Sequence, residues 1–167
     1  MACTQTLSGL TRDCSNNMGG VKEVYIANFD DVSGVTIASD IITAITMVNT
    51  AKFKKYTFRP QTAELAITPQ VNKENGVTYF QSILSMVFAK MDTTKRLEIN
   101  ALSLGDLAIV VVDNNGKMWY LGKDNPVTLN TGEGGTGKAY TDANRYGISL
   151  EDNSLQLPYE VTATIPV

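Results

Sequence analysis

The sequence predicts a mainly β protein with one α-helix, because short runs rich in β-branched and aromatic residues dominate it and only one segment has a helical pattern. The clearest strand signal is the hairpin Asp106–Gly122, where the buried run 107–112 is followed by the preferred turn pair Asn115-Gly116 and a returning strand. No internal repeat or interdomain linker stands out. A chain of 167 residues fits one domain. We therefore expect an N-terminal arm over residues 1–20 and a single β-rich domain over 21–167.

Three further runs before residue 75 have the composition of strands. Lys22–Phe29 is rich in β-branched and aromatic residues and ends at a pair of aspartates, and Ile41–Val48 has the same character after a second turn. Ala63–Val71 alternates but contains Pro69, which predicts an edge strand or a bulge.

The run Lys52–Pro60 predicts a strand with one charged side. Tyr56 and Phe58 fall on one face, and Lys55 and Thr57 fall on the other. This pattern favours a solvent-facing or contact strand over a core strand.

The longest apolar-rich run, Gly76–Met91, favours an extended strand over a helix because of its β-branched and aromatic residues. Alternation makes both of its faces apolar, so we expect the strand to be covered on two sides. The two faces are Phe80, Leu84, Met86 and Phe88, and Val77, Tyr79, Ile83 and Val87.

The helical pattern follows this strand directly. Asp92 is a suitable N-cap and Gly105 a suitable stop for the segment between them. Leu97, Ala101 and Leu104 have the spacing of one apolar helix face.

The stretch Asn130–Tyr140 matches most of a phosphate-binding P-loop, through Gly132, Gly137 and Lys138. The signature requires a magnesium-coordinating Ser or Thr next, but the chain has Ala139. No helical period follows, and too few residues remain for a nucleotide-binding fold. We therefore interpret the glycines as a mobile β-connection, formed by Gly132, Gly134, Gly135 and Gly137.

The composition argues against an enzyme. The chain contains no histidine. This excludes nucleophile activation by histidine, acid–base catalysis by histidine and zinc sites with histidine ligands. Its acidic residues are scattered through turns, so we expect no catalytic, metal or cofactor residues and no small-molecule substrate. The net charge of −3 and pI near 4.9 also argue against a nucleic-acid-binding surface.

The two cysteines, Cys3 and Cys14, could form a local disulfide or remain free thiols, and we favour free thiols. The N-terminal segment lacks the apolar run of a signal peptide, and no later run is long enough for a membrane span. We expect a protein made in the cytoplasm. In the hairpin, Trp119 and Tyr120 lie on opposite faces, where core packing and contact with a partner or ligand are both open.

Three stretches carry a family resemblance that covers about half the chain. They are the tail TGEGGTGKAYTDANRYGISLEDNSLQLPYEV, the opening ACTQTLSGLTRDC with MGGVKEVYIANF, and the hairpin DNNGKMWYLG. Together they resemble structural proteins of bacteriophages from gut Bacteroidetes and, more distantly, tail-tube proteins of long-tailed phages. None of them is a catalytic signature.

The resemblance implies a small β-barrel or sandwich with one flanking helix, as in tail-tube proteins. It also implies a virion subunit, made in the host bacterial cytoplasm, whose hexameric rings stack into a tube. DNA would pass through this tube without sequence-specific binding, and the partners would be other copies and other virion proteins. An acidic chain suits such a lumen, because a negative wall lets DNA slide.

Tube proteins of this kind carry a long loop or hairpin that contacts the next ring, and residues 52–75 are our candidate. The candidate inter-subunit contacts are Lys54, Lys55, Tyr56, Phe58 and Arg59. Ordinary surface charge is an equally good interpretation of the basic residues.

Two other functions remain open. One is a head-decoration, head-tail connector or tail-terminator protein, which would form a closed oligomer that does not polymerise. The other is a β-sandwich module that binds carbohydrate or a host surface through Trp119 and Tyr120.

Overall fold

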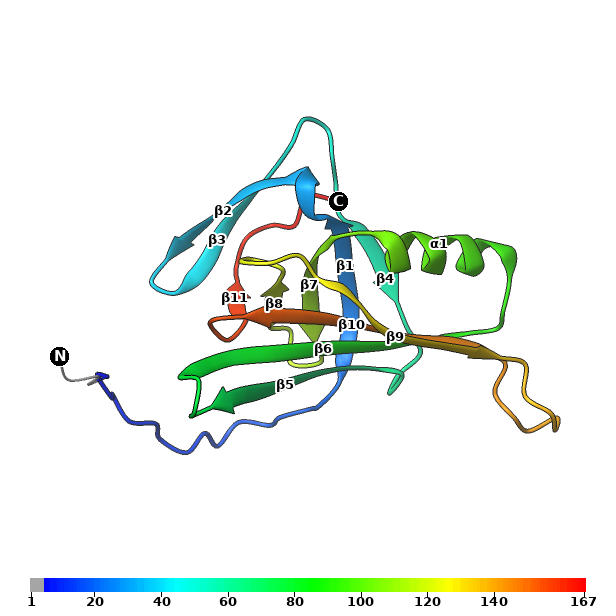
Figure 1. Cartoon of the computed structure of the whole chain (residues 1–167), viewed down its shortest axis with the longest axis horizontal. Helices are drawn as coiled ribbons and strands as arrows, with labels where there is room; N and C mark the ends of the chain where they lie inside the picture. Colours follow the sequence, from blue (N-terminus) through cyan, green and yellow to red (C-terminus); the bar gives the residue numbers. More distant parts are fainter. Residues whose placement is uncertain (1–4) are drawn as a thin grey trace.

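The computed structural model describes residues 5–167, and this part of the chain folds as a β-sandwich with one α-helix (Figure 1). Strands make up 50% of the structure and helix 9%, which confirms the mainly β prediction. The strands form two separate sheets that share a core, so the architecture is a sandwich and not a closed barrel.

The larger sheet has seven strands in the order β2-β3-β11-β8-β7-β1-β4. All neighbours are antiparallel except β11 and β3. A 3-10 turn, Phe29–Asp31, links β1 to β2. The bounds are β1 Val21–Asn28, β2 Val32–Ala38, β3 Ile41–Met47, β4 Lys54–Thr57, β7 Leu107–Asp113, β8 Met118–Leu121 and β11 Tyr159–Val161.

The smaller sheet has four antiparallel strands in the order β5-β6-β10-β9. Its strands are β5 Ala63–Asn72, β6 Val77–Ala89, β9 Thr128–Gly135 and β10 Arg145–Ser154. Strand β5 lies at the edge, as the proline in its sequence predicts, and Pro69 pairs with Phe80 without a bulge.

Strand β7 lies inside the larger sheet and is buried on both faces, as its unbroken apolar sequence predicts. Ile109 and Val111 face the smaller sheet and pack with Leu84 and Leu150 in the core between the sheets. Ala108 and Val110 face the opposite way into a second core. That second core includes Ile42, Ile45, Phe53, Tyr120 and Val161.

Strand β6 is covered on one face only. Leu84 and Met86 are fully buried in the core between the sheets, whereas Ile83 and Val87 on the other face are half-buried. The prediction of two covered faces is therefore wrong within the single chain. Its neighbours explain this, because Glu64 and Glu151 flank β6 on the outer face and keep that face in water.

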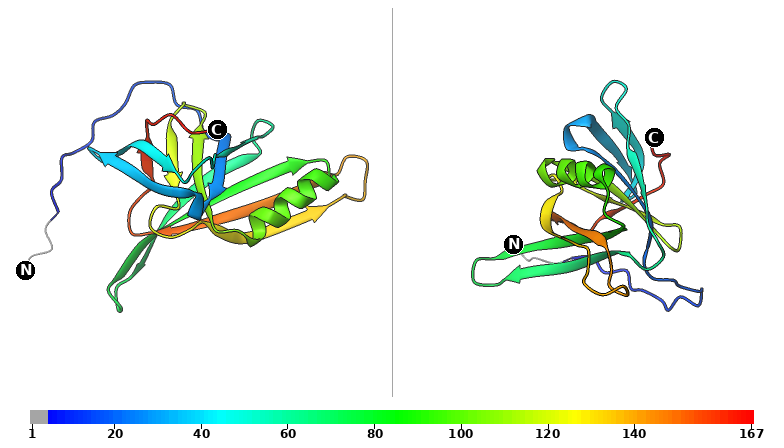
Figure 2. Two further views of the ribbon diagram at one scale, coloured as in Figure 1. Left: turned by 90° about the horizontal axis from the view of Figure 1, so that it is seen from above. Right: turned by 90° about the vertical axis from the view of Figure 1, so that its right-hand side faces the viewer.

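The helix α1 spans Thr93–Leu104 and begins as predicted, with the Asp92 side chain accepting a hydrogen bond from Lys95 N at 2.8 Å. It lies over the end of the smaller sheet that the larger sheet does not reach (Figures 1 and 2). Its buried side is not the apolar face that the spacing indicates. Leu102 and the half-buried Ile99 pack into the core, while Leu97, Ala101 and Leu104 face solvent.

The region 52–75, expected as an extended loop or hairpin, instead supplies strands to two sheets. Strand β4 pairs with β1 in the larger sheet, and β5 pairs with β6 in the smaller sheet. The chain crosses between the sheets at Pro60 and Gln61, and Gln61 has a φ of 65°. The projecting hairpin is therefore β5–β6, with its turn at 73–76.

The glycine-rich segment is mostly a strand and not a loose connection. Gly132, Gly134 and Gly135 belong to β9 and pair with β10. The ring of Tyr146 lies over Gly134, so close that a Cβ there would be 2.9 Å from it. An aromatic ring from the neighbouring strand thus supplies the packing that glycine lacks.

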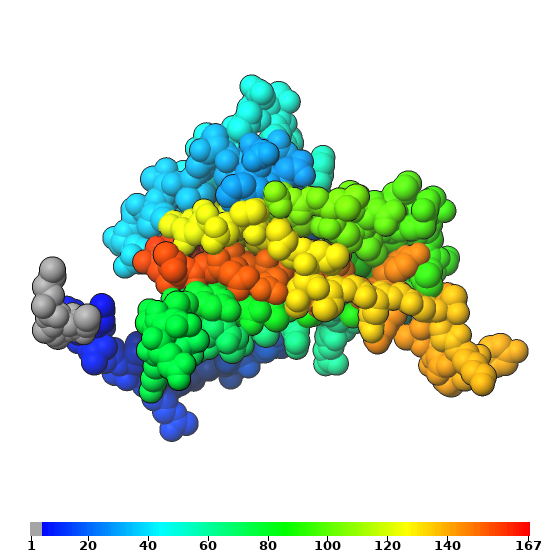
Figure 3. All heavy atoms as spheres, in the orientation of Figure 1, coloured from blue at the N-terminus to red at the C-terminus, as the bar shows by residue number. Residues whose placement is uncertain are grey.

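The N-terminal arm and the β9–β10 loop project from the body in opposite directions. Residues 5–16 form an exposed arm without helix or strand, and the β9–β10 loop, 136–144, extends from the other end (Figures 2 and 3). Strand β1 begins at Val21, and residues 1–4 of the expected arm over residues 1–20 lie outside the described residues.

Candidate interaction surfaces

The five residues expected to contact a neighbouring subunit lie together, on β4 and just after it, but three of them already make contacts within the chain. Lys55 Nζ lies 2.6 Å from Glu23 Oε2. The hydrogen bond from this ammonium holds the pKa of the Glu23 carboxyl below its usual value, and Tyr25 donates a second bond to the same group.

Tyr56 and Phe58 pack inward against Phe88 of β6. The ring centroids of Phe58 and Phe88 lie 5.4 Å apart, and the Tyr56 ring meets Phe88 edge-on at 6.5 Å. The Tyr56 hydroxyl donates a hydrogen bond to Glu98 on α1, and burial raises the pKa of this phenol.

Lys54 and Arg59 are exposed and form no ion pair among residues 5–167. They are the members of the group that remain available to a partner. The inter-subunit role of the whole group stays a prediction.

The outward side of α1 carries the apolar face that the spacing of Leu97, Ala101 and Leu104 predicts. We call Leu97, Ala101 and Leu104 the helix stripe. Leu97 is 57% exposed and Leu104 is 90% exposed. The spacing indicated correctly that the three residues share one face, but not which way that face points.

A groove of about 570 Å³ opens beside the free edge of β5, between that strand, the β7–β8 hairpin and residues 17–20. We call it the edge groove. Its apolar lining includes Met18, Leu65, Ile67, Trp119 and Leu157, and its charged lining is Glu64 and Asp113, with no lysine or arginine. Sequence reasoning did not find it, because its walls come from four separate parts of the chain.

Trp119 and Tyr120 have the opposite orientations that alternation predicts. Tyr120 is 3% exposed and belongs to the second core, so the core interpretation holds for it. Trp119 is half-buried in the edge groove, where its Nε1 donates a hydrogen bond to Asp113 Oδ2 at 3.2 Å.

Asp142 organises the loop that resembles a P-loop. Its Oδ2 accepts hydrogen bonds from the backbone N–H groups of Lys138 at 2.8 Å and Ala139 at 2.7 Å. These bonds hold the pKa of the Asp142 carboxyl below its usual value. In a P-loop such amides bind phosphate, whereas here the protein's own carboxylate occupies them.

Asp152 on β10 is a buried acid between the sheets. It is 2% exposed, its Oδ2 accepts a hydrogen bond from Ser154, and its Oδ1 has no hydrogen-bond partner among the described residues. Burial raises the pKa of this carboxyl, and burial with the charge of Asp152 raises the pKa of Tyr120 to about 12.

Within residues 5–167, no group of three or more His, Cys, Asp or Glu side chains is arranged to hold a metal ion. No helix in the same range is long and apolar enough to cross a membrane. Cys14 is an exposed free thiol, and Cys3 lies outside the described residues.

Comparison with known proteins finds no matching family model, no matching curated protein and no matching solved structure.

Proposed function

We propose that this protein is a virion structural protein of a bacteriophage, the tail-tube subunit, whose copies form stacked rings around a DNA channel. The resemblance of its tail, its opening and its β7–β8 hairpin to phage structural proteins supports the proposal. The structure adds an independent observation, which concerns where the chain exposes apolar side chains.

That observation carries the proposal: apolar side chains lie in water on the projecting segments and on the outward side of α1. Exposure is 90% for Leu7 and 103% for Leu10 on the arm, 90% for Leu104 on the helix stripe, and 110% for Tyr140 on the β9–β10 loop. Val71 and Val77, beside the turn of the β5–β6 hairpin, are 59% and 46% exposed. Contact with other copies of the chain would remove these apolar side chains from water.

These features lie at opposite ends of the molecule. The arm and the tip of the β5–β6 hairpin project at one end, and α1 with the β9–β10 loop occupies the other (Figure 1). Different contact surfaces at two ends favour head-to-tail association, which closes into a ring when the rotation between copies allows it. The net charge of −3 is compatible with a channel wall along which DNA slides.

Sedimentation velocity over a concentration series tests the proposal. The wild-type chain, with a monomer mass of 18.1 kDa, is expected to sediment as large oligomers that grow with concentration. Leu104→Lys, on the helix stripe, should shift the distribution toward monomer, whereas Ala44→Lys, an exposed change on β3, should not. A monomer at every concentration would contradict the proposal.

The same experiment separates the alternatives. A single closed oligomer that stops growing would favour a head-decoration, connector or tail-terminator protein. The half-buried Trp119 in the edge groove favours the binding-module alternative. This alternative predicts a monomer or dimer that binds glycan saturably, and Trp119→Ala should abolish the glycan binding.

A further inference from the structure

The arm leaves the body in a direction fixed by its root. Asn114 donates hydrogen bonds to the carbonyls of Gly19 and Gly20, and Asn115 bonds to Asn17 and to the N–H of Met18. Gly20 has a φ of 98°, and a Cβ there would lie 2.9 Å from Asn114 Nδ2, so the bend requires glycine.

Beyond this root, residues 5–16 make no hydrogen bond to the rest of the described chain. They run toward the same end of the molecule as β5 but lie apart from this strand when the molecule is seen from above (Figures 1 and 2). Leu7 and Leu10 are exposed along almost their entire side chains. An arm that is pinned at its root and unpaired beyond it has to find a further surface if these leucines are to be buried.

The free edge of β5 offers such a surface. Val87 N donates to Thr62 O at 3.0 Å, and the β5–β6 pairing continues from there without a register shift. Because hydrogen-bonded pairs alternate in an antiparallel ladder, even-numbered residues of β5 bond to β6. The backbone groups of the odd-numbered residues, including Leu65 and Ile67, therefore point outward and unpaired.

Pro69 confirms this register and limits the usable edge. It is an odd-numbered residue, so its missing N–H falls on the outward side, where β6 requires no donor. A strand added to this edge would gain hydrogen bonds along Ala63–Ile67 and would lose one at Pro69. The free part of the edge is thus the part that borders the edge groove, because Leu65 and Ile67 also line that groove.

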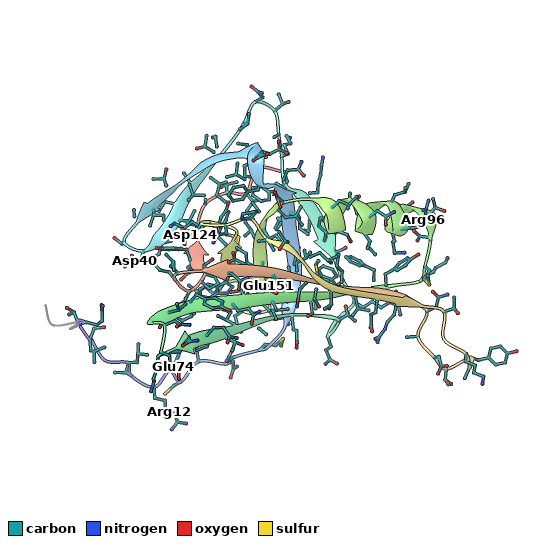
Figure 4. All side chains as sticks on the ribbon, in the orientation of Figure 1. Arg12, Asp40, Glu74, Arg96, Asp124 and Glu151 are labelled. Atoms are coloured by element: carbon teal, nitrogen blue, oxygen red, sulfur yellow. The ribbon has the colours of Figure 1, made fainter. Side chains whose placement is uncertain are left out.

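The arm has the length and the chemistry to fill this site. In an extended arm, Leu10 and Arg12 project from the same side, since side chains alternate. The groove presents apolar walls for a leucine, and Glu64 and Asp113 for an arginine. Arg12 forms no ion pair within residues 5–167 and points away from the body (Figure 4).

We propose that the edge groove of one copy receives the arm of a second copy, which adds as a strand to the free edge of β5 and places Leu10 in the groove. This inference rests on the self-association proposed above and names one contact within it.

Disulfide trapping between two single-cysteine proteins tests the proposal. In a Cys3→Ser, Cys14→Ser background, one protein carries Leu10→Cys and the other, made longer by a tag, carries Ile67→Cys. Seating of the arm raises the local concentration of the two thiols, so mild oxidation should give about tenfold more heterodimer than with the control acceptor Ala44→Cys. Adding Arg12→Glu should reduce the heterodimer, and adding Arg12→Lys should largely preserve it.

Equal trapping by Ile67→Cys and Ala44→Cys, or no heterodimer at any concentration, would overturn the proposal. A chain carrying both Leu10→Cys and Ile67→Cys identifies the occupant. A compact cross-linked monomer as its main product would show that the arm fills its own groove and would overturn the assignment to a second copy.

Electron microscopy of the same samples separates this inference from the proposed function. Rings without the specific heterodimer would overturn the arm proposal alone. The specific heterodimer without rings would support the arm contact and contradict the tube assembly.

Discussion

Tyr56, on the edge strand β4, donates a hydrogen bond to Glu98 Oε1 on α1 and so joins two segments that are 42 residues apart in the sequence. The phenol ring beneath this bond packs against Phe88. The contact holds the helix over the end of the core that the larger sheet leaves open.

Tyr56→Phe should lower the free energy of unfolding by about 1 kcal/mol, because it removes the hydrogen bond to Glu98 and keeps the ring. Urea unfolding measures the change. Tyr140→Phe is the matched control, since Tyr140 is fully exposed and its hydroxyl bonds to no described residue. Equal stability of Tyr56→Phe and Tyr140→Phe would show that the bond does not hold α1.

Two leucines of α1 should differ sharply although they lie two residues apart. Leu102 is 4% exposed, so Leu102→Ala should cost about 2–4 kcal/mol of stability. Leu104 is 90% exposed, so Leu104→Ala should change stability by less than about 0.5 kcal/mol. Thermal unfolding at low protein concentration, where assembly does not contribute, measures both. A larger loss in Leu104→Ala would mean that the helix is rotated from the observed orientation.

Asp152 should make stability depend on pH. Because burial raises its folded pKa, the native state holds this proton more tightly than the unfolded chain does. Its contribution is therefore most favourable below the usual value of 3.8, falls as pH rises from there through the raised folded pKa, and stays low above it.

Asp152→Asn should remove this dependence and raise stability at neutral pH by about 1 kcal/mol, because it eliminates a buried charge with an unpaired oxygen. Urea titrations at several pH values measure the effect. Asp40→Asn, at the exposed β2–β3 turn, controls for the change in net charge (Figure 4). A variant less stable than the wild type at neutral pH would show that the ionised carboxylate is required.

The β9–β10 loop should depend on one carboxylate. Asp142→Ala removes the acceptor for two backbone amides, so hydrogen exchange should accelerate across residues 136–144 with little change in global stability. Thr141→Ala, in the same exposed loop, is the control. Gly137→Ala should have a similar effect, since its Cβ would lie 2.3 Å from Asp142 Cβ. Unchanged exchange in Asp142→Ala would show that the loop does not need this cap.

Local signals predicted much of the fold. The Asn115-Gly116 turn, the apolar strand before it and the Asp92 cap all lie where the sequence indicates, because each depends on neighbours in the chain. Strand β2 was missed. Its sequence contains Ser33 and Gly34, and glycine is uncommon in strands. The β2–β3 turn has Ser39 and Asp40 at φ values of 53° and 61°, where Asn-Gly is the pair that usually indicates a hairpin turn.

The missed features depend on contacts between distant segments. The helix stripe has core-like spacing, but Leu102 faces the opening between the sheets and so decides which side of α1 is buried. The glycines of β9 suggest a loop until Tyr146 of β10 is placed over Gly134. The edge groove requires four separate segments and the arm root requires two, and no local sequence pattern brings these segments together.

Negative-stain electron microscopy of the purified, untagged protein over a concentration series tests the central claim most directly. The proposed function predicts rings about 80–100 Å across, the size expected for a few domains of this size side by side, that stack into tubes as concentration rises. Uniform single particles of monomer size at every concentration would contradict it.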